Sequence, residues 1–139
     1  MRFSGLLHAE LIGALASLGH TDMIVIADAG LPIPAGVPKI DLAIRANLPS
    51  FLEVSNLIAA EMPVEAITIA NEMASMNSEL LSQLNDDILN WSKSQSKEIK
   101  VSSLSHEDFK VLSQKARLII RTGEFSPYAN MVMHAGVAF

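Results

Sequence analysis

Apolar residues recur along this chain with two periods, one typical of amphipathic helices and one typical of buried strands. The N-terminal region carries an apolar stripe with helical spacing, made of Leu7, Leu11, Leu15 and Leu18. Gly19 follows this stripe, at the position where a left-handed residue commonly ends a helix. We therefore predict a helix that ends near Gly19.

Five short runs, apolar or alternating, predict strands. They are Met23–Ala27, Val64–Ala70, Ile99–Leu104, Leu118–Ile120 and Met131–Met133. The stretch Leu31–Pro34 predicts a stiff extended loop, because proline fits neither a helix interior nor a central strand. A second loop, at 122–130, contains Gly, Ser and Pro and precedes the last strand.

Three further helices are predicted by residues that commonly cap helix N-termini. Ser50 begins a Ser-x-x-Glu capping box for a helix that runs through about Ala60. Ser105 begins a similar pattern for a helix that runs to about Gln114. Asn77 is expected to cap a helix between these two. The core face of that helix is predicted to consist of Leu80, Leu81, Leu84, Ile88 and Trp91.

Strands that alternate with helices indicate an α/β fold. We predict a three-layer α/β/α sandwich with a mixed, largely parallel sheet. No linker composition, charge block or internal repeat divides the chain, so residues 1–139 are expected to form a single domain. In open α/β sheets the binding crevice lies beyond the carboxyl ends of the strands.

The composition is unusually apolar. Of the 139 residues, 50% are hydrophobic and 18% are charged, whereas charged residues make up about 25% of a typical soluble domain. Such a chain either spans a membrane or buries part of its surface in an oligomer.

The sequence argues against a membrane span. The run Met23–Ala27 is far shorter than the roughly 20 residues of a spanning helix, and Asp22 and Asp28 flank it. His8 and Glu10 interrupt the apolar start that a signal peptide needs. We therefore expect a cytoplasmic homo-oligomer.

Charge and missing residue types exclude several classes of function. The net charge is -5 and no Lys/Arg cluster is present, so we expect no nucleic-acid partner and no membrane partner. The chain has no cysteine, which excludes disulfides, thiolate metal sites and cysteine nucleophiles. No glycine-rich phosphate loop predicts a nucleotide site. A metal site made of His20, Asp22, Asp28 and His106 lacks a recognised ligand spacing, so we expect no metal and no cofactor.

Polar residues at the ends of predicted elements are the candidate functional residues. Asp28 ends a strand just before Gly30, where it can serve a binding site or cap nearby backbone N–H groups. His20 and His106 lie beside helix ends, which fits a catalytic role or a surface or capping role. His134 lies within the last apolar strand and is expected to be a satisfied core or interface histidine.

The 122–130 loop holds the only tyrosine, Tyr128, which Ala129 and Asn130 follow. A phenol, an amide and backbone groups supply both donors and acceptors, as the recognition of sugar hydroxyls requires. An ordinary turn with a partly buried tyrosine is the alternative.

A longer pattern connects these residues. It comprises the stretches Leu18–Asp22, Val25–Pro34, Ile40–Ala43, Pro49–Phe51, Gly123–Asn130 and Ala135–Phe139. Taken together, these stretches resemble the D-ribose pyranase and L-fucose mutarotase family, and they cover almost the whole chain.

Two of the motifs resemble the ribose branch of that family. Gly19–Asp22 reads Gly-His-Thr-Asp, and Asp28–Pro34 reads Asp-Ala-Gly-Leu-Pro-Ile-Pro. The fucose branch more often has Gly-His-Gly-Asp and Asp-Ala-Asn-Phe-Pro. His8 departs from the family, which usually has asparagine there, and this change concerns a local cap or contact rather than a catalytic position.

The resemblance implies an activity and a site. It implies a sugar ring isomerase that interconverts β-D-ribopyranose and β-D-ribofuranose, the form of D-ribose that a ribokinase accepts. This ring opening and reclosure requires no metal and no redox cofactor. His20 matches the catalytic acid, while Asp28, His106 and Tyr128–Asn130 match sugar-binding positions. Relatives form decamers of two stacked pentameric rings, with sites between adjacent subunits.

Several alternatives stay open at this point. An L-fucose-type mutarotase would use the same proton transfers without a change of ring size. A non-catalytic sugar-binding accessory of ribose uptake would bind ribose without converting it. Asp28 either orients a histidine or binds a hydroxyl. The general base, the anomer preference and the residues that a neighbouring subunit contributes are not determined by the sequence.

Overall fold

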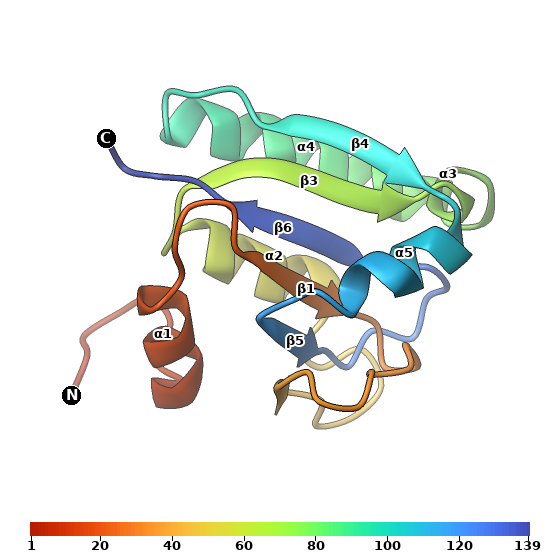
Figure 1. Ribbon diagram of the computed structural model, residues 1–139, viewed down its shortest axis with the longest axis horizontal. Helices are drawn as coiled ribbons and strands as arrows, with labels where there is room; N and C mark the ends of the chain where they lie inside the picture. The colour runs from red at the N-terminus through yellow and green to blue at the C-terminus, as the bar shows by residue number, and fades with distance from the viewer.

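The computed structural model describes residues 1–139 as a mixed six-stranded sheet with helices on both faces (Figure 1). The strands are β1 (Met23–Ala27), β2 (Lys39–Asp41), β3 (Val64–Ala70), β4 (Lys100–Leu104), β5 (Leu118–Arg121) and β6 (Met131–Ala135). The helices are α1 (Ala9–Ala16), α2 (Phe51–Ala59), α3 (Glu72–Met76), α4 (Ser78–Ser94) and α5 (His106–Ser113). Every predicted strand and helix is present. The sequence did not predict β2 and α3, because three and five residues are too few to show a period.

The strand order is β2-β5-β1-β6-β3-β4. β6 is antiparallel to both of its neighbours, β1 and β3, while the other three pairs are parallel. The predicted α/β fold with a mixed, largely parallel sheet is therefore confirmed. Because only β6 runs in reverse, the other five strands all end along one edge of the sheet, where β6 begins (Figure 1). We call this edge the carboxyl edge and the opposite one the amino edge.

Apolar cores lie on both faces of the sheet. Side chains alternate along β1, so that Ile24 and Ile26 join one core while Val25 and Ala27 join the other. The larger core packs beneath α1, α2 and α4, and the smaller one packs beneath α5 through Phe109. Figure 1 shows α2 and α4 behind the strands and α5 in front of them, which gives three layers.

The end of α1 differs from the prediction. The helix ends at Ala16 with Ser17 as a right-handed C-cap. The N–H group and the hydroxyl of Ser17 both donate to the carbonyl of Ala14, so these helix-end groups are paired before the chain reaches Gly19. The prediction of a left-handed Gly19 is wrong, because the positive φ in this turn, 68°, belongs to Thr21.

Asn77 precedes α4, but its side chain makes no capping hydrogen bond. Its Nδ2 instead donates to Ser126 Oγ and to the carbonyl of Pro127, each at 2.9 Å. The predicted capping role of Asn77 is wrong, because its amide holds the 122–130 loop against the start of α4.

The other caps agree with the sequence. The Ser50 capping box is complete, and Ser105 Oγ accepts from the backbone N–H of Asp108 at 3.2 Å. His8 is the N-cap of α1, and its Nδ1 accepts from Leu11 N at 3.2 Å, so a cap is kept where asparagine was expected. No helix combines the length and the apolar character that crossing a membrane requires.

Candidate functional site

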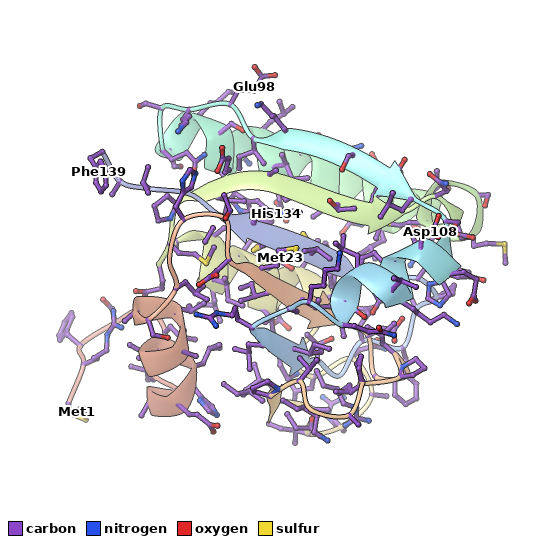
Figure 2. All side chains as sticks on the ribbon, in the orientation of Figure 1. Met1, Met23, Glu98, Asp108, His134 and Phe139 are labelled. Carbon is purple, nitrogen blue, oxygen red and sulfur yellow. The ribbon has the colours of Figure 1, made fainter.

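The predicted site residues divide between the two edges of the sheet. Asp28 follows β1, His106 begins α5 just after β4, and Tyr128–Asn130 precede β6, so all of them lie at the carboxyl edge. His20 precedes β1 and lies at the amino edge. The five residues of β1 lie between the two edges, a length of roughly 17 Å. In Figure 2, Met23 and His134 mark the amino edge and Asp108 marks the carboxyl edge.

Asp28 and Asn130 form a reciprocal pair at the carboxyl edge. The backbone N–H of Asp28 donates to Asn130 Oδ1 at 2.8 Å, and Asn130 Nδ2 donates to Asp28 Oδ2 at 2.9 Å. Asp28 Oδ1 also accepts from Gly30 N at 2.9 Å, which confirms that this carboxylate caps backbone. A carboxylate has about four acceptor positions, so Asp28 keeps capacity for a further donor. Its protein partners include no histidine, which favours the binding of a hydroxyl.

His106 contacts Tyr128, whose carbonyl accepts from the backbone N–H of Asn130. Their rings are in edge-to-face contact, with centroids 5.1 Å apart and an interplanar angle of 85°. The Nδ1 atom of His106 is buried without a hydrogen-bond partner. Buried polar atoms are nearly always paired, so this nitrogen marks a place where a ligand group would complete the structure.

Tyr128 adopts a left-handed backbone conformation, with φ of 55°. This conformation is uncommon for residues other than glycine and is often found at functional sites. Asn77 holds the preceding carbonyl, and Glu124 supports the same loop by accepting from Ser126 Oγ at 2.8 Å and from Phe51 N at 2.9 Å. The buried carboxylate of Glu124 thus ties the Tyr128 loop to the start of α2.

Two further charged residues fix the groups at the carboxyl edge. Glu72 of α3 accepts from the backbone N–H of His106, at 3.0 and 3.2 Å. Arg121 Nε donates to the carbonyl of Ala29 at 3.0 Å, and its Nη1 donates to both Asp41 oxygens. Burial raises the pKa of Asp41, but hydrogen bonds from Ala43 N and Arg121 outweigh it and hold this pKa below its usual value. The turn after Asp28 is therefore anchored to β5 and β2.

At the amino edge, His20 Nε2 lies 2.6 Å from Glu65 Oε2. The hydrogen bond with His20 is the largest influence on the pKa of Glu65, which is held below its usual value. The turn that carries His20 is fixed by Asp22, whose Oδ2 accepts from Gly19 N at 2.9 Å and from Arg117 Nε at 3.3 Å. His20 itself stays exposed, with 52% of its side chain accessible.

His134 lies near this pair on β6 and is half-buried. Its Nε2 lies 3.2 Å from Thr68 Oγ1, which lies 3.1 Å from Ser102 Oγ. The expectation of a satisfied histidine is confirmed for this ring nitrogen. Burial lowers the pKa of His134, and the nearby charge of Glu65 partly opposes that effect.

The structure contains no group of three or more His, Asp or Glu side chains close enough to hold a metal ion. The conceivable set His20, Asp22, Asp28 and His106 is divided between the two edges. A cavity of 780 Å³ opens near the amino edge, where Glu65 and Gly136–Phe139 are among its lining residues. Its lining includes neither His20 nor any predicted sugar-binding residue.

Sequence reasoning missed three supporting residues: Glu65, Glu72 and Arg121. A charged residue within or directly after an apolar strand run was the available signal for Glu65 and Arg121. Glu72 gave no such signal, because its helix was not predicted and its contact with His106 joins residues 34 positions apart.

Comparison with known proteins gives consistent matches. The model of the RbsD / FucU transport protein family matches residues 1–138. A D-ribose pyranase of Bacillus cereus (strain B4264) is 46% identical over 139 residues, which is 100% of both proteins. The structure of Bacillus subtilis RbsD complexed with D-ribose matches with a TM-score of 0.88 and 46% identity, over 100% of both chains. A fucose mutarotase from Streptococcus pneumoniae in complex with L-fucose has a TM-score of 0.77 and 28% identity, over 93% of this chain and 92% of that one.

Proposed function

This chain belongs to the RbsD / FucU transport protein family, and we propose on that basis that it is an isomerase that interconverts β-D-ribopyranose and β-D-ribofuranose. The observation that carries the proposal is the full-length likeness to D-ribose pyranases. The likeness to the fucose mutarotase is lower in identity, coverage and TM-score. The Gly19–Asp22 and Asp28–Pro34 motifs, which resemble the ribose branch of the family, also favour ribose over fucose.

The reaction needs only proton transfers. A proton delivered to the ring oxygen of ribopyranose lets its bond to the anomeric carbon break, while a base removes the proton of the anomeric hydroxyl. The open-chain aldehyde then rotates and closes through the neighbouring hydroxyl, whose proton passes to the deprotonated acid, while the protonated base returns a proton to the aldehyde oxygen. The former ring oxygen keeps its new proton as a free hydroxyl. A histidine titrates near neutral pH and can serve either transfer. We assign the acid role to His20.

We assign sugar binding to the carboxyl edge. Asp28 keeps acceptor positions beyond its bonds to Gly30 and Asn130, and His106 has a buried ring nitrogen without a partner. Tyr128 and Ala129 complete the wall, with backbone and phenol groups suited to hydroxyls. In these assignments all of the sugar-binding residues belong to one chain.

The proposed site requires a second copy of the chain. A proton donor must come within hydrogen-bond distance of the ring oxygen, yet His20 lies at the edge opposite the sugar-binding residues. Exposed apolar side chains on Ile44, Leu48 and Leu57 line a groove of 260 Å³, which supports contacts between subunits. We propose that these contacts join amino edge to carboxyl edge in rings, as the resemblance to decamers of two pentameric rings implies, in a cytoplasmic enzyme.

Exchange NMR on equilibrated D-ribose tests the proposal. The enzyme should transfer magnetisation between pyranose and furanose anomeric signals, whereas a binding accessory at low concentration should not. A fucose-type mutarotase should instead exchange the two anomers of L-fucose faster than it exchanges ribose ring forms.

His20→Ala provides the residue-level test. We expect it to lower the exchange rate by about 10²–10⁴-fold, the usual contribution of general acid–base catalysis. The circular dichroism spectrum should stay unchanged, because His20 is an exposed turn residue. Full activity in the folded variant would refute the acid role.

A further inference from the structure

We propose that Glu65 is a positioning residue for His20: its carboxylate holds the Nε2–H group and leaves Nδ1 as the nitrogen that faces the sugar. This inference rests on the proposed function. The juxtaposition that carries it is the 2.6 Å contact between His20 Nε2 and Glu65 Oε2 at the amino edge.

The chemistry of the pair fixes which ring nitrogen carries the hydrogen. An ionised carboxylate can only accept hydrogen bonds, so Nε2 must be the donor. The short distance is typical of a charge-assisted hydrogen bond. Lys97 and Lys100 also lower the pKa of Glu65, so the carboxylate remains charged. Nδ1 of His20 makes no hydrogen bond within the chain and is therefore free for a proton transfer. In the protonated ring Nδ1–H is the proton that His20 delivers to the sugar as the acid, and in the neutral ring Nδ1 takes a proton back while Nε2–H stays bound to Glu65.

The backbone holds both partners in place. The pairing of β3 with β6 is irregular between Val64 and Ala66, so that Glu65, which lies between them, has no paired residue on β6. Such bulges re-aim side chains and are frequent near active sites. On the other side, the N–H of Thr21 donates to Ala135 O at 2.9 Å, which ties the His20 turn to the end of β6. Both partners are thus attached to one end of the sheet.

The same surroundings single out His20 as the partner of Glu65. The ring of His134, also near this carboxylate, is bonded to Thr68 instead. His20 and Glu65 keep 52% and 33% of their side chains exposed, and ion pairs this exposed contribute little to stability. A role in orienting the imidazole explains the contact better than a role in folding.

The ring tautomer gives a test that does not depend on turnover. We expect ¹⁵N NMR of the neutral His20 ring to show the Nε2–H form in the full-length protein. Glu65→Ala and Glu65→Gln should shift the ring towards a mixture that includes Nδ1–H. Glu65→Asp retains the charge but shortens the reach, so it should resemble Glu65→Ala. Glu98→Gln changes an exposed carboxylate that is not the partner of His20, and it should leave the His20 signals unchanged.

Kinetics provide the second readout. The sugar is held at the carboxyl edge of another copy, so Glu65→Gln should lower kcat on the order of tenfold while KM stays within about twofold. An Nδ1–H tautomer in the parent protein, or an unchanged kcat in Glu65→Gln, would overturn the proposal. If the parent protein does not convert ribose, the proposed function fails, while the tautomer result still decides the role of Glu65.

Discussion

At the scale of single residues, the pairing of Asp28 with Asn130 is the most demanding arrangement in the site. Asn130 is 1% exposed, and its amide both accepts from the backbone of Asp28 and donates to its carboxylate. Only a side chain with one donor and one acceptor end satisfies both bonds. The Asn130 amide therefore fixes the orientation of the Asp28 carboxylate in addition to filling buried space.

Asn130→Asp should disturb this arrangement while keeping the shape of the side chain. The change replaces the donor by a second carboxylate oxygen 2.9 Å from Asp28 Oδ2. A buried hydrogen bond is lost and like charges face each other, so we expect the free energy of unfolding to fall by about 1–3 kcal/mol. Urea denaturation at neutral pH measures this change.

A matched change on the surface controls for the added charge. Asn85→Asp alters an exposed side chain of α4, where the effect should stay within about 0.5 kcal/mol. Equal midpoints for Asn130→Asp and the parent protein would show that the Asp28 carboxylate does not depend on the amide.

The positions of the candidate site residues could be predicted from the sequence, whereas the residues that support them could not. Asp28 and His106 stand at the ends of strong strand and helix signals, so their common edge follows from the α/β pattern. Glu65 meets His20 across 45 positions in the chain. That contact depends on the order of strands and on a local bulge, which no period in one sequence encodes.

At the scale of elements, strong periodic segments were predicted well, and the two errors, at Asn77 and at Gly19, have different causes. Asn77 has the sequence position of a cap, but its amide bonds to Ser126 and Pro127 of a distant loop. α1 ends before Gly19 because Ser17 pairs the last turn. The first error comes from a distant loop that the sequence pattern does not show, whereas the second comes from a local bond of Ser17 that ends the helix before the glycine.

The loop before β6 depends on a close backbone approach at Gly123. A Cβ atom there would lie 2.6 Å from the carbonyl oxygens of Arg45 and Leu48 and 2.7 Å from Leu48 N. Because these are backbone atoms, Gly123→Ala must displace the chain, and we expect a loss of about 1–3 kcal/mol in the free energy of unfolding. The displacement should also weaken ribose binding, since Tyr128 is on the same loop.

Gly13→Ala is the matched control, measured by the same urea titration. Gly13 is exposed within α1, and a Cβ atom there would have no neighbour within 4 Å. Alanine favours the helix interior over glycine, so this variant should gain up to about 1 kcal/mol. A Gly123→Ala protein as stable as the parent would show that the loop can move without cost.

At the scale of the whole molecule, the direction of the sheet decides which surfaces the proposed assembly brings together. His20 and the proposed sugar-binding residues lie at opposite edges, so the proposed site would join two different surfaces of two copies. Contacts between unlike surfaces are head-to-tail, and they close into rings or continue as filaments. The unusually apolar composition, with 18% charged residues, agrees with surface buried in such contacts.

Complementation between two inactive variants tests this shared site directly. His20→Ala lacks the acid at the amino edge, and Tyr128→Ala lacks a binding residue at the carboxyl edge. When the two are co-expressed in equal amounts, about a quarter of head-to-tail contacts should combine an intact His20 with an intact Tyr128 and regain activity in exchange NMR. Asp28→Ala with Tyr128→Ala is the matched control. Both substitutions affect the carboxyl edge, which each site takes from a single chain, so every site keeps at least one defect and no activity should return.

Light scattering should show a particle of about ten subunits. An active monomer, or a His20→Ala and Tyr128→Ala mixture as inactive as the control, would exclude the shared site.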